Sequence, residues 1–156
     1  RDVERSRGLG DVYKRQIISW DSIHIQSYTR IGNNLLMMDT DFHYVMNRET
    51  RMIKANHAPI VIGENNWIGG WCVVKKGTQT PKGTIVAGPY SMIGKNYVGK
   101  IPEYSMLAGS PAKLIMEGVQ RVENVRTENM LKVFFKTHDE SFIVSDKMNI
   151  DNFCMA

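Results

Sequence analysis

The sequence contains no long apolar run, few cysteines and no concentration of charge of one sign. Because it lacks a long apolar run, we predict no membrane span. Its two cysteines, Cys72 and Cys154, form neither a paired motif nor a metal-binding spacing, which indicates reduced thiols in a cytoplasmic protein. The net charge of +4 is modest and the charged residues are scattered along the chain, so the sequence shows no basic stripe that would bind nucleic acid. The composition therefore favours one domain of 156 residues with room for a hydrophobic core.

The first sixteen residues stand apart from the rest of the sequence. They show no hydrophobic period and match neither a secretory signal nor a transit peptide. The segment Asp-Val-Tyr-Lys-Arg-Gln at 11–16 resembles the translated end of a transposon used to prepare sequencing libraries. We therefore expect 1–16 to be a non-native artefact, and the natural N-terminal part of the protein to be missing.

Apolar residues recur at every sixth position over two stretches of the chain. The first stretch contains Ile25, Ile31 and Met37. The second contains Ile62, Ile68, Val74, Thr80, Val86 and Met92, of which Thr80 is the weak member. A step of six fits neither a helix of 3.6 residues per turn nor a simple alternating strand. It fits a short strand followed by a tight corner, and three such sides close a triangular coil that stacks on the next.

The phase of this period slips by one residue between His43 and Ile62, which indicates a loop that leaves the coil over 44–58. We therefore predict an all-β solenoid over 17–115, followed over 116–156 by an extension with one short helix. That helix is expected over 127–136 with Thr127 as its cap, and 145–156 is expected to be a loose end. An ordinary antiparallel β-domain, with its apolar residues in register by chance, is the alternative.

Three segments resemble, in the same order, parts of the hexapeptide-repeat acetyltransferases, above all the maltose, galactoside and sugar O-acetyltransferase branch. They are Asp-Thr-Asp-Phe-His at 39–43, Pro-Ile-Val-Ile-Gly-Glu-Asn-Asn-Trp-Ile-Gly-Gly at 59–70, and Leu-Ala-Gly-Ser-Pro-Ala-Lys-Leu-Ile at 107–115. The resemblance covers 25–115 and implies a left-handed parallel β-helix, acetyl-CoA as co-substrate without a metal, and a homotrimer. Two stretches depart from the family pattern: 78–81 lacks the usual Val-Thr-Ile-Gly, and 88–91 carries an extra residue.

Acetyl transfer from a thioester needs a base, a donor to the oxyanion and a site that holds both substrates together. Histidine suits the first task because its ordinary pKa lies close to neutrality. His43 resembles the family's catalytic histidine, and a loop histidine without chemistry is the alternative interpretation. If 39–43 is extended, Asp39, Asp41 and His43 share one face, so that Asp41 can orient the imidazole. His57 is the second candidate for the base.

The resemblance implies further residues of the site. Trp67 matches a tryptophan that walls the family's active site, with packing against a neighbouring coil or subunit as the alternative. The backbone near Gly70 is the expected oxyanion donor. Acceptor binding is assigned to Asp39, Trp67 and His57. Coenzyme A binding is assigned to the backbone of Gly70 and Gly88 and to the ammonium groups of Lys95 and Lys113.

These features predict transfer of an acetyl group from acetyl-CoA to a hydroxyl or amine of a small acceptor, with a sugar of polysaccharide biosynthesis expected by resemblance. Metal-dependent carbonic anhydrases use the same solenoid, but they need histidines placed together as zinc ligands. Here His43 and His57 are fourteen positions apart. A solenoid that serves as a scaffold or binding module without catalysis is the third interpretation.

Overall fold

The computed structural model describes residues 16–155, so the transposon-like interpretation of 1–16 lies almost wholly outside the described residues. Gln16 itself begins the first strand. The strands are β1 (Gln16–Ile18), β2 (Ile23–Ile25), β3 (Arg30–Ile31), β4 (Leu36–Met38), β5 (Ile60–Ile62), β6 (Trp67–Ile68), β7 (Val73–Lys75), β8 (Ile85–Val86), β9 (Met92–Ile93), β10 (Met106–Gly109) and β11 (Ala112–Met116). Two helices, α1 (Val125–Phe134) and α2 (Ile150–Cys154), follow them.

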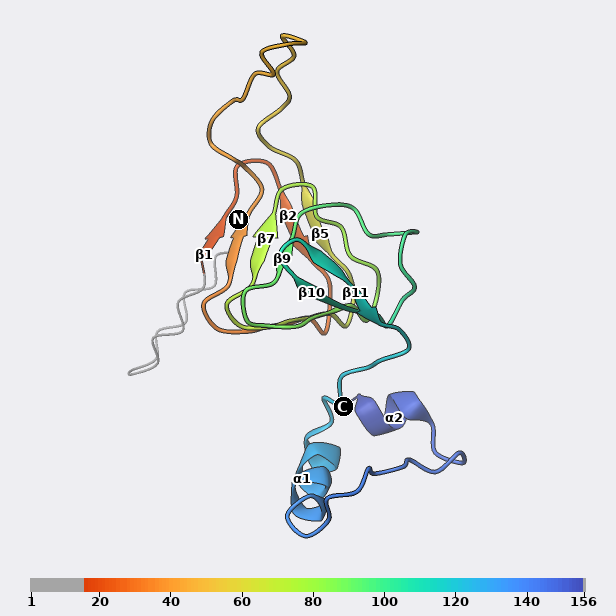
Figure 1. The fold of residues 1–156 in the computed structure, drawn as a ribbon. Coiled ribbons are helices and arrows are strands. Elements are labelled where there is room, and N and C mark those ends of the chain that lie inside the picture. The colour runs from red at the N-terminus through yellow and green to blue at the C-terminus, as the bar shows by residue number, and fades with distance from the viewer. Residues whose placement is uncertain (1–15, 156) are drawn as a thin grey trace, which may run out of the picture.

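Three sheets share these strands, and the chain visits them in rotation (Figure 1). Their orders are β1-β4-β7-β9, β11-β10-β8-β6-β3 and β2-β5. The third sheet continues as isolated parallel bridges from Val61 to Gln79 and from Gln79 to Asn96. Within the described residues, every pair of these strands is parallel except β10 with β11. Successive passes of the chain therefore lie one above the other, and each pass satisfies the backbone polar groups of the next.

The side chains of the six-residue period form columns along the inside of these sheets. Ile31 aligns with Ile68 and then Val86, and Met37 aligns with Val74. The prediction of inward-facing positions is confirmed for six residues that are at most 3% exposed: Met37, Ile62, Ile68, Val74, Thr80 and Val86. It is wrong at Met92, because the extra residue in 88–91 shifts the phase and brings Ile93 opposite Val74. Ile25, in the first pass, is 40% exposed.

Thr80 occupies a core position because its hydroxyl finds two partners there. It donates to the side-chain oxygen of Asn66 at 2.6 Å and accepts from the backbone N–H of Gly63 at 3.0 Å. The amide group of Asn66 in turn donates to the carbonyls of Glu64 and Pro81. This satisfied network explains how a polar residue replaces an apolar one at the weakest position of the period.

A long loop leaves the strand body after β4 and returns before β5 (Figure 1). Antiparallel bridges join Thr40 to His57 at its base and Met46 to Ile53 further out. At its tip the side chain of Asn47 accepts hydrogen bonds from the next turn of backbone. The excursion therefore has the form of an irregular hairpin whose base is the bridge from Thr40 to His57.

The C-terminal extension contains two helices where the sequence predicted one. The first begins at Val125, and its cap is Asn124, whose side chain accepts from the N–H groups of Arg126 and Thr127. The expectation of Thr127 as the cap is therefore wrong, because Asn124 fills that position one turn earlier. The expectation of a loose end over 145–156 is also wrong: α2 buries Phe153 and Cys154. Neither helix is long and apolar enough to cross a membrane, within the described part of the chain.

Candidate active site

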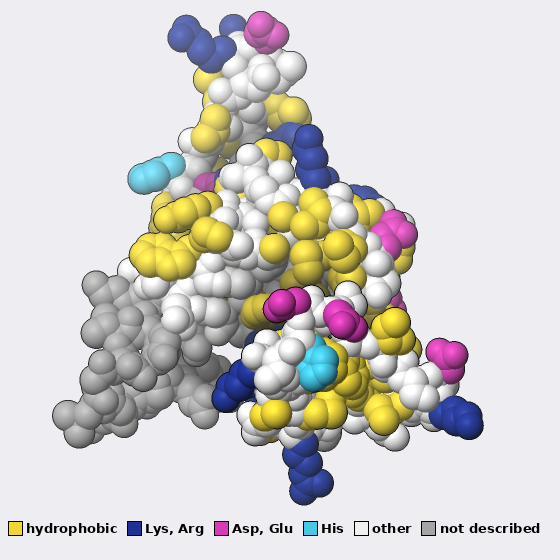
Figure 2. All heavy atoms as spheres, turned by 60° about the horizontal axis from the view of Figure 1, so that its bottom comes forward, with side chains coloured by type: hydrophobic (Ala, Val, Ile, Leu, Met, Phe, Trp, Pro, Cys, Tyr) yellow, Lys and Arg dark blue, Asp and Glu magenta, His cyan; other side chains and the backbone are white. Residues whose placement is uncertain are grey.

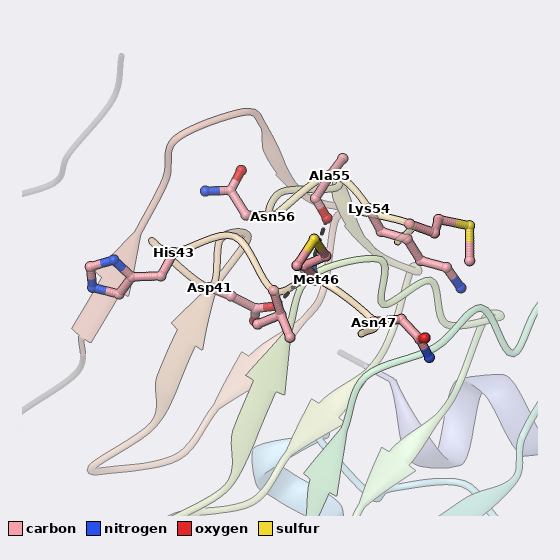
Figure 3. A pocket seen from close by; sticks show the side chains of 10 residues that line it. Asp41, His43, Met46, Asn47, Lys54, Ala55 and Asn56 are labelled. Carbon is pink, nitrogen blue, oxygen red and sulfur yellow. Dashed lines mark hydrogen bonds and ion pairs between the residues drawn. The ribbon is translucent and has the colours of Figure 1, made fainter. Parts of the chain in front are cut away.

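The loop between β4 and β5, together with Lys76 after β7, borders an open cavity of about 380 Å³ (Figure 3). It combines charged, amide and thioether side chains, so it offers both hydrogen-bonding groups and apolar surface. Its lining residues are Asp41, His43, Val45, Met46, Asn47, Met52, Lys54, Ala55, Asn56 and Lys76. Hereafter we call it the loop cavity.

Asp41 and Lys76 form the ion pair that fastens the loop to the strand body. The ammonium nitrogen of Lys76 lies 2.7 Å from the Asp41 carboxylate and donates to the carbonyl of Ala55 at 2.9 Å. Both limbs of the loop are thereby tied to the residue that follows β7. Lys76 received no role in the sequence analysis, and the adjacent pair Lys75-Lys76 is the signal that marks it.

His43 does not share a face with Asp41 and Asp39, so the expectation of an extended 39–43 segment is wrong. Phe42 has a φ of 62°, which turns the chain between Asp41 and His43. Only the backbones of Asp41 and His43 meet, since the His43 N–H donates to the Asp41 carbonyl at 2.7 Å. In Figure 3 the imidazole extends to the opposite side from the Asp41 carboxylate. His43 is exposed at the mouth of the loop cavity.

Asp39 supports the fold and does not line the loop cavity. Its side chain is fully buried and accepts hydrogen bonds from the N–H groups of Trp20 at 2.8 Å and Asp21 at 2.9 Å. The hydroxyl of Ser19 donates a third at 3.1 Å. This carboxylate holds the turn between β1 and β2, in place of the acceptor contact expected from the sequence.

Replacing Asp39 by alanine is expected to lower the free energy of unfolding by about 1.5–3 kcal/mol, because three donors lose a charged acceptor. Urea unfolding followed by circular dichroism measures this loss. Asp21→Ala is the matched control, since only the backbone of Asp21 contacts Asp39. Equal unfolding midpoints for the two variants would contradict the role of Asp39 in holding this turn.

The other predicted acceptor residues lie at two different places. His57 is half-buried at the loop base, where Nδ1 lies 3.1 Å from the side-chain oxygen of Asn56. Trp67 lies on the outer face of β6, is 41% exposed, and does not line the loop cavity. Within one chain, His43 and Trp67 are therefore not part of the same pocket.

The residues expected to bind coenzyme A through their backbone meet at one corner of the strand body. A Cβ added to Gly88 would lie 3.2 Å from the amide nitrogen of Gly70, so the two backbones are in close contact. Trp71 and Tyr90 flank this corner with exposed rings whose centroids are 6.3 Å apart. The Tyr90 N–H donates to the Trp71 carbonyl at 3.0 Å, so the two passes are hydrogen-bonded at this corner.

A second cavity, of about 230 Å³, is lined by lysines and by no acidic side chain. Lys95 lies here with its ammonium nitrogen 5.3 Å from the centre of the Tyr97 ring. Burial raises the pKa of Tyr97, so its phenol stays neutral. Lys113 lies outside this cavity, on β11. Its lining residues are Lys75, Lys76, Met92, Gly94, Lys95, Tyr97 and Pro111, and we call it the lysine cavity.

Two further features concern possible metal ligands and the thiol of Cys72. Between Gln16 and Met155, no three His, Cys, Asp or Glu side chains are grouped to hold a metal ion. Cys72 is buried in the core, and this burial raises the pKa of its thiol. A buried neutral thiol is a poor nucleophile, so Cys72 is not a candidate for a covalent intermediate.

Comparison with known proteins relates the chain to acetyltransferases. It is 34% identical over 124 residues to the probable acetyltransferase Rv3034c of Mycobacterium tuberculosis, a match that covers 74% of this chain and 38% of the relative. The chain thus spans well under half of that protein. No family model matches.

Two solved structures share the fold. The polysialic acid O-acetyltransferase OatWY is 20% identical, with a TM-score of 0.54 over 72% of this chain and 64% of the other. The polySia-specific acetyltransferase NeuO is 18% identical, with a TM-score of 0.52 over 76% of this chain and 60% of the other. The rotation of parallel strands described above is therefore an arrangement found in acetyltransferases.

Proposed function

We propose that this chain is part of a left-handed parallel β-helix acetyltransferase that uses acetyl-CoA and a small acceptor, with a sugar as the acceptor class. The observation that carries the proposal is the 34% identity over 124 residues to a probable acetyltransferase. The strand rotation, shared with two acetyltransferases of known structure, supports the same conclusion.

In this proposal His43 is the general base. Its imidazole removes the proton from the acceptor hydroxyl or amine as the acceptor oxygen or nitrogen attacks the thioester carbonyl. The tetrahedral oxyanion then collapses, the carbon–sulfur bond breaks, and the imidazolium returns the proton to the departing thiolate. A backbone N–H near Gly70 is the proposed oxyanion donor. In the same proposal Asp41, through its ion pair with Lys76, holds the loop that carries His43.

The acceptor site is proposed at the loop cavity. Amide side chains such as Asn47 and Asn56 suit the hydroxyl groups of a sugar, and the thioethers of Met46 and Met52 suit its apolar face. Both structural neighbours are named as polysialic acid acetyltransferases, which makes an acidic sugar the first acceptor to test. The charge of Lys54 in the lining is compatible with such a sugar.

The complete site is proposed to form between neighbouring copies in a homotrimer. Within one chain His43 lines the loop cavity, whereas Trp67 and the Gly70–Gly88 corner lie elsewhere on the strand body. A second copy that places its own Trp67 and its Gly70–Gly88 corner beside His43 would complete the site. His57, at the loop base, then has a supporting role in the acceptor pocket.

The lysine cavity is proposed to receive the phosphates of coenzyme A, with Lys75 added to the predicted Lys95 and with Lys113 beside it. Replacing Lys95 by methionine is expected to raise the KM for acetyl-CoA about 2–5-fold, because an exposed charge pair contributes modestly. Steady-state kinetics with acetyl-CoA measures this change, with Lys136→Met, an exposed residue just beyond α1, as control. An unchanged KM in Lys95→Met would remove Lys95 from the phosphate site.

The function itself is tested by the release of free thiol from acetyl-CoA in the presence of a panel of neutral and acidic sugars. The proposal predicts release that depends on the acceptor and exceeds the rate without acceptor. Release from none of the sugars or simple amines, by a folded protein that binds acetyl-CoA, would favour a binding module without catalysis.

A further inference from the structure

The segment 117–124, between β11 and α1, crosses the outer face of the sheet β11-β10-β8-β6-β3. We call this segment the strap. The Val119 N–H donates to the Tyr104 carbonyl, just before β10, at 2.8 Å. Further along, Arg121 lies over the ring of Trp67 on β6, and Glu123 bonds Arg30 on β3 at 2.6 Å. These three contacts follow the order of the strands, so the strap runs across the sheet from β10 to β3.

The strap covers a row of outward-facing residues. Arg30 pairs with Trp67 and Trp67 with Ile85 in the register of neighbouring strands. Ile85 is only 5% exposed although it lies outside the inward column, which shows that this face of the sheet is covered. Trp67, in the same row, keeps 41% of its surface exposed. The strap therefore shields part of this face and leaves part of the indole accessible.

Glu123 joins the strap to the sheet through two arginines. Its carboxylate contacts the guanidinium groups of Arg30 and Arg121, and its side chain is 12% exposed. Burial alone would raise the pKa of Glu123, but hydrogen bonds from Arg121 and Arg30 outweigh it and hold that pKa below its usual range. The carboxylate thus stays charged at neutral pH and fixes Arg121, whose carbon Cζ lies 6.0 Å from the centre of the Trp67 ring.

The strap also connects the strand body to the C-terminal helices. The N–H groups of Glu123 and Asn124 both donate to the carbonyl of Cys154, at the end of α2. The amide group of Asn124 donates to the carbonyl of Met155 at 3.1 Å. The strap is thus held at both of its ends, by the sheet and by the helices. Figure 2 shows the helical unit in front of the strand body, with hydrophobic side chains exposed on both.

We infer that Arg121 is a positioning residue that holds the Trp67 indole, and that the strap borders the surface on which Trp67 is exposed. This inference rests on the proposed function, in which Trp67 of one copy meets the substrates. A guanidinium about 6 Å from the centre of an indole is attracted to the ring and restrains it without covering its other parts. Glu123, itself paired with Arg30, in turn keeps the guanidinium of Arg121 from turning away from the Trp67 ring.

The contact is measured by acrylamide quenching of tryptophan fluorescence in the full chain carrying Trp20→Phe and Trp71→Phe, so that Trp67 alone reports. In this background Arg121→Gln is expected to raise the quenching constant about twofold, because the indole loses the cation that covers it. Arg121→Lys should restore most of the protection, since it keeps a charge over the ring. Arg126→Gln is the control, as the side chain of Arg126 is exposed on α1. Quenching that is equal in Arg121→Gln and Arg126→Gln would overturn the contact.

The positioning role is measured in the otherwise unaltered chain. Arg121→Gln is expected to lower kcat for acetyl transfer about 2–5-fold, the range of a partly exposed cation–π contact, with KM for acetyl-CoA unchanged. Arg121→Lys should recover most of that loss. If Arg30, Glu123 and Arg121 act as a unit, Glu123→Gln should lower kcat as Arg121→Gln does. An unchanged kcat, or a change confined to the KM for acetyl-CoA, would overturn the inference. If even the unaltered chain transfers no acetyl group, the proposed function fails, whatever the quenching shows.

Discussion

Replacing His43 by alanine is expected to lower kcat for acetyl transfer by about 10²–10⁴-fold, because the acceptor then loses its general base. The fold should be unaffected, since His43 is exposed and, among residues 16–155, bonds only through its backbone N–H, to the carbonyl of Asp41. The rate of thiol release at saturating acetyl-CoA and acceptor measures the change. Circular dichroism and the unfolding midpoint of the same sample show that the protein is intact.

Two other histidines provide matched controls for this prediction. His138 stacks on Phe134 in the C-terminal extension, and His138→Ala should leave kcat unchanged. His57→Ala should have a smaller effect than His43→Ala, because His57 is half-buried at the loop base beside Asn56. A large loss in His57→Ala with full activity in His43→Ala would transfer the role of base to His57.

Replacing Gly69 by alanine is expected to lower the free energy of unfolding by about 3 kcal/mol, at the upper end of the usual cost of overpacking. The added Cβ would lie 2.5 Å from the amide nitrogen of Gly88 and 2.9 Å from the carbonyl oxygen of Val86. Both are backbone atoms of the next pass, so they cannot rotate aside as a side chain does. The melting temperature should fall by several degrees, since about 1 kcal/mol corresponds to 2–4 °C at this chain length.

Gly94 supplies the control for this effect. A Cβ there would lie 3.3 Å from the Cβ of Lys75, a contact that a shift of a few tenths of an ångström relieves. Gly94→Ala should therefore lower the melting temperature much less than Gly69→Ala. The Gly69 variant should also weaken acetyl-CoA binding, because a shift at Gly88 changes the corner where coenzyme A is proposed to bind. Equal melting temperatures for the two alanine variants would contradict the close packing of successive passes.

The strand rotation was predictable because its signal is local and repeated. Residues such as Ile68 and Val74 recur every six positions along the inner column. Each strand is short, so a few neighbouring residues in the sequence are enough to indicate it. The failure at Met92 has a physical cause in the inserted residue near Tyr90, which moves Ile93 into the column. Thr80 was the weak point of the pattern, and its buried partner Asn66 shows why a hydroxyl is accepted there.

The arrangement of the site was less predictable, because it depends on backbone turns and on distant ion pairs. A positive φ at Phe42 separates the faces of Asp41 and His43, and nothing in the local sequence marks that turn. The strap depends on a contact between Arg30 and Glu123, which are 93 positions apart. A six-residue period carries no information on either feature, because it records only which side chains face inward.

The central claim is the transfer of an acetyl group to an acceptor, and mass spectrometry tests it most directly. The full chain is incubated with isotope-labelled acetyl-CoA and a mixture of neutral and acidic sugars, and the products are compared with those of the His43→Ala variant. We predict a sugar that carries the labelled acetyl group with the unaltered chain and far less of it with the variant. Label found only in acetyl-CoA and free acetate, with equal amounts in both samples, would contradict the account.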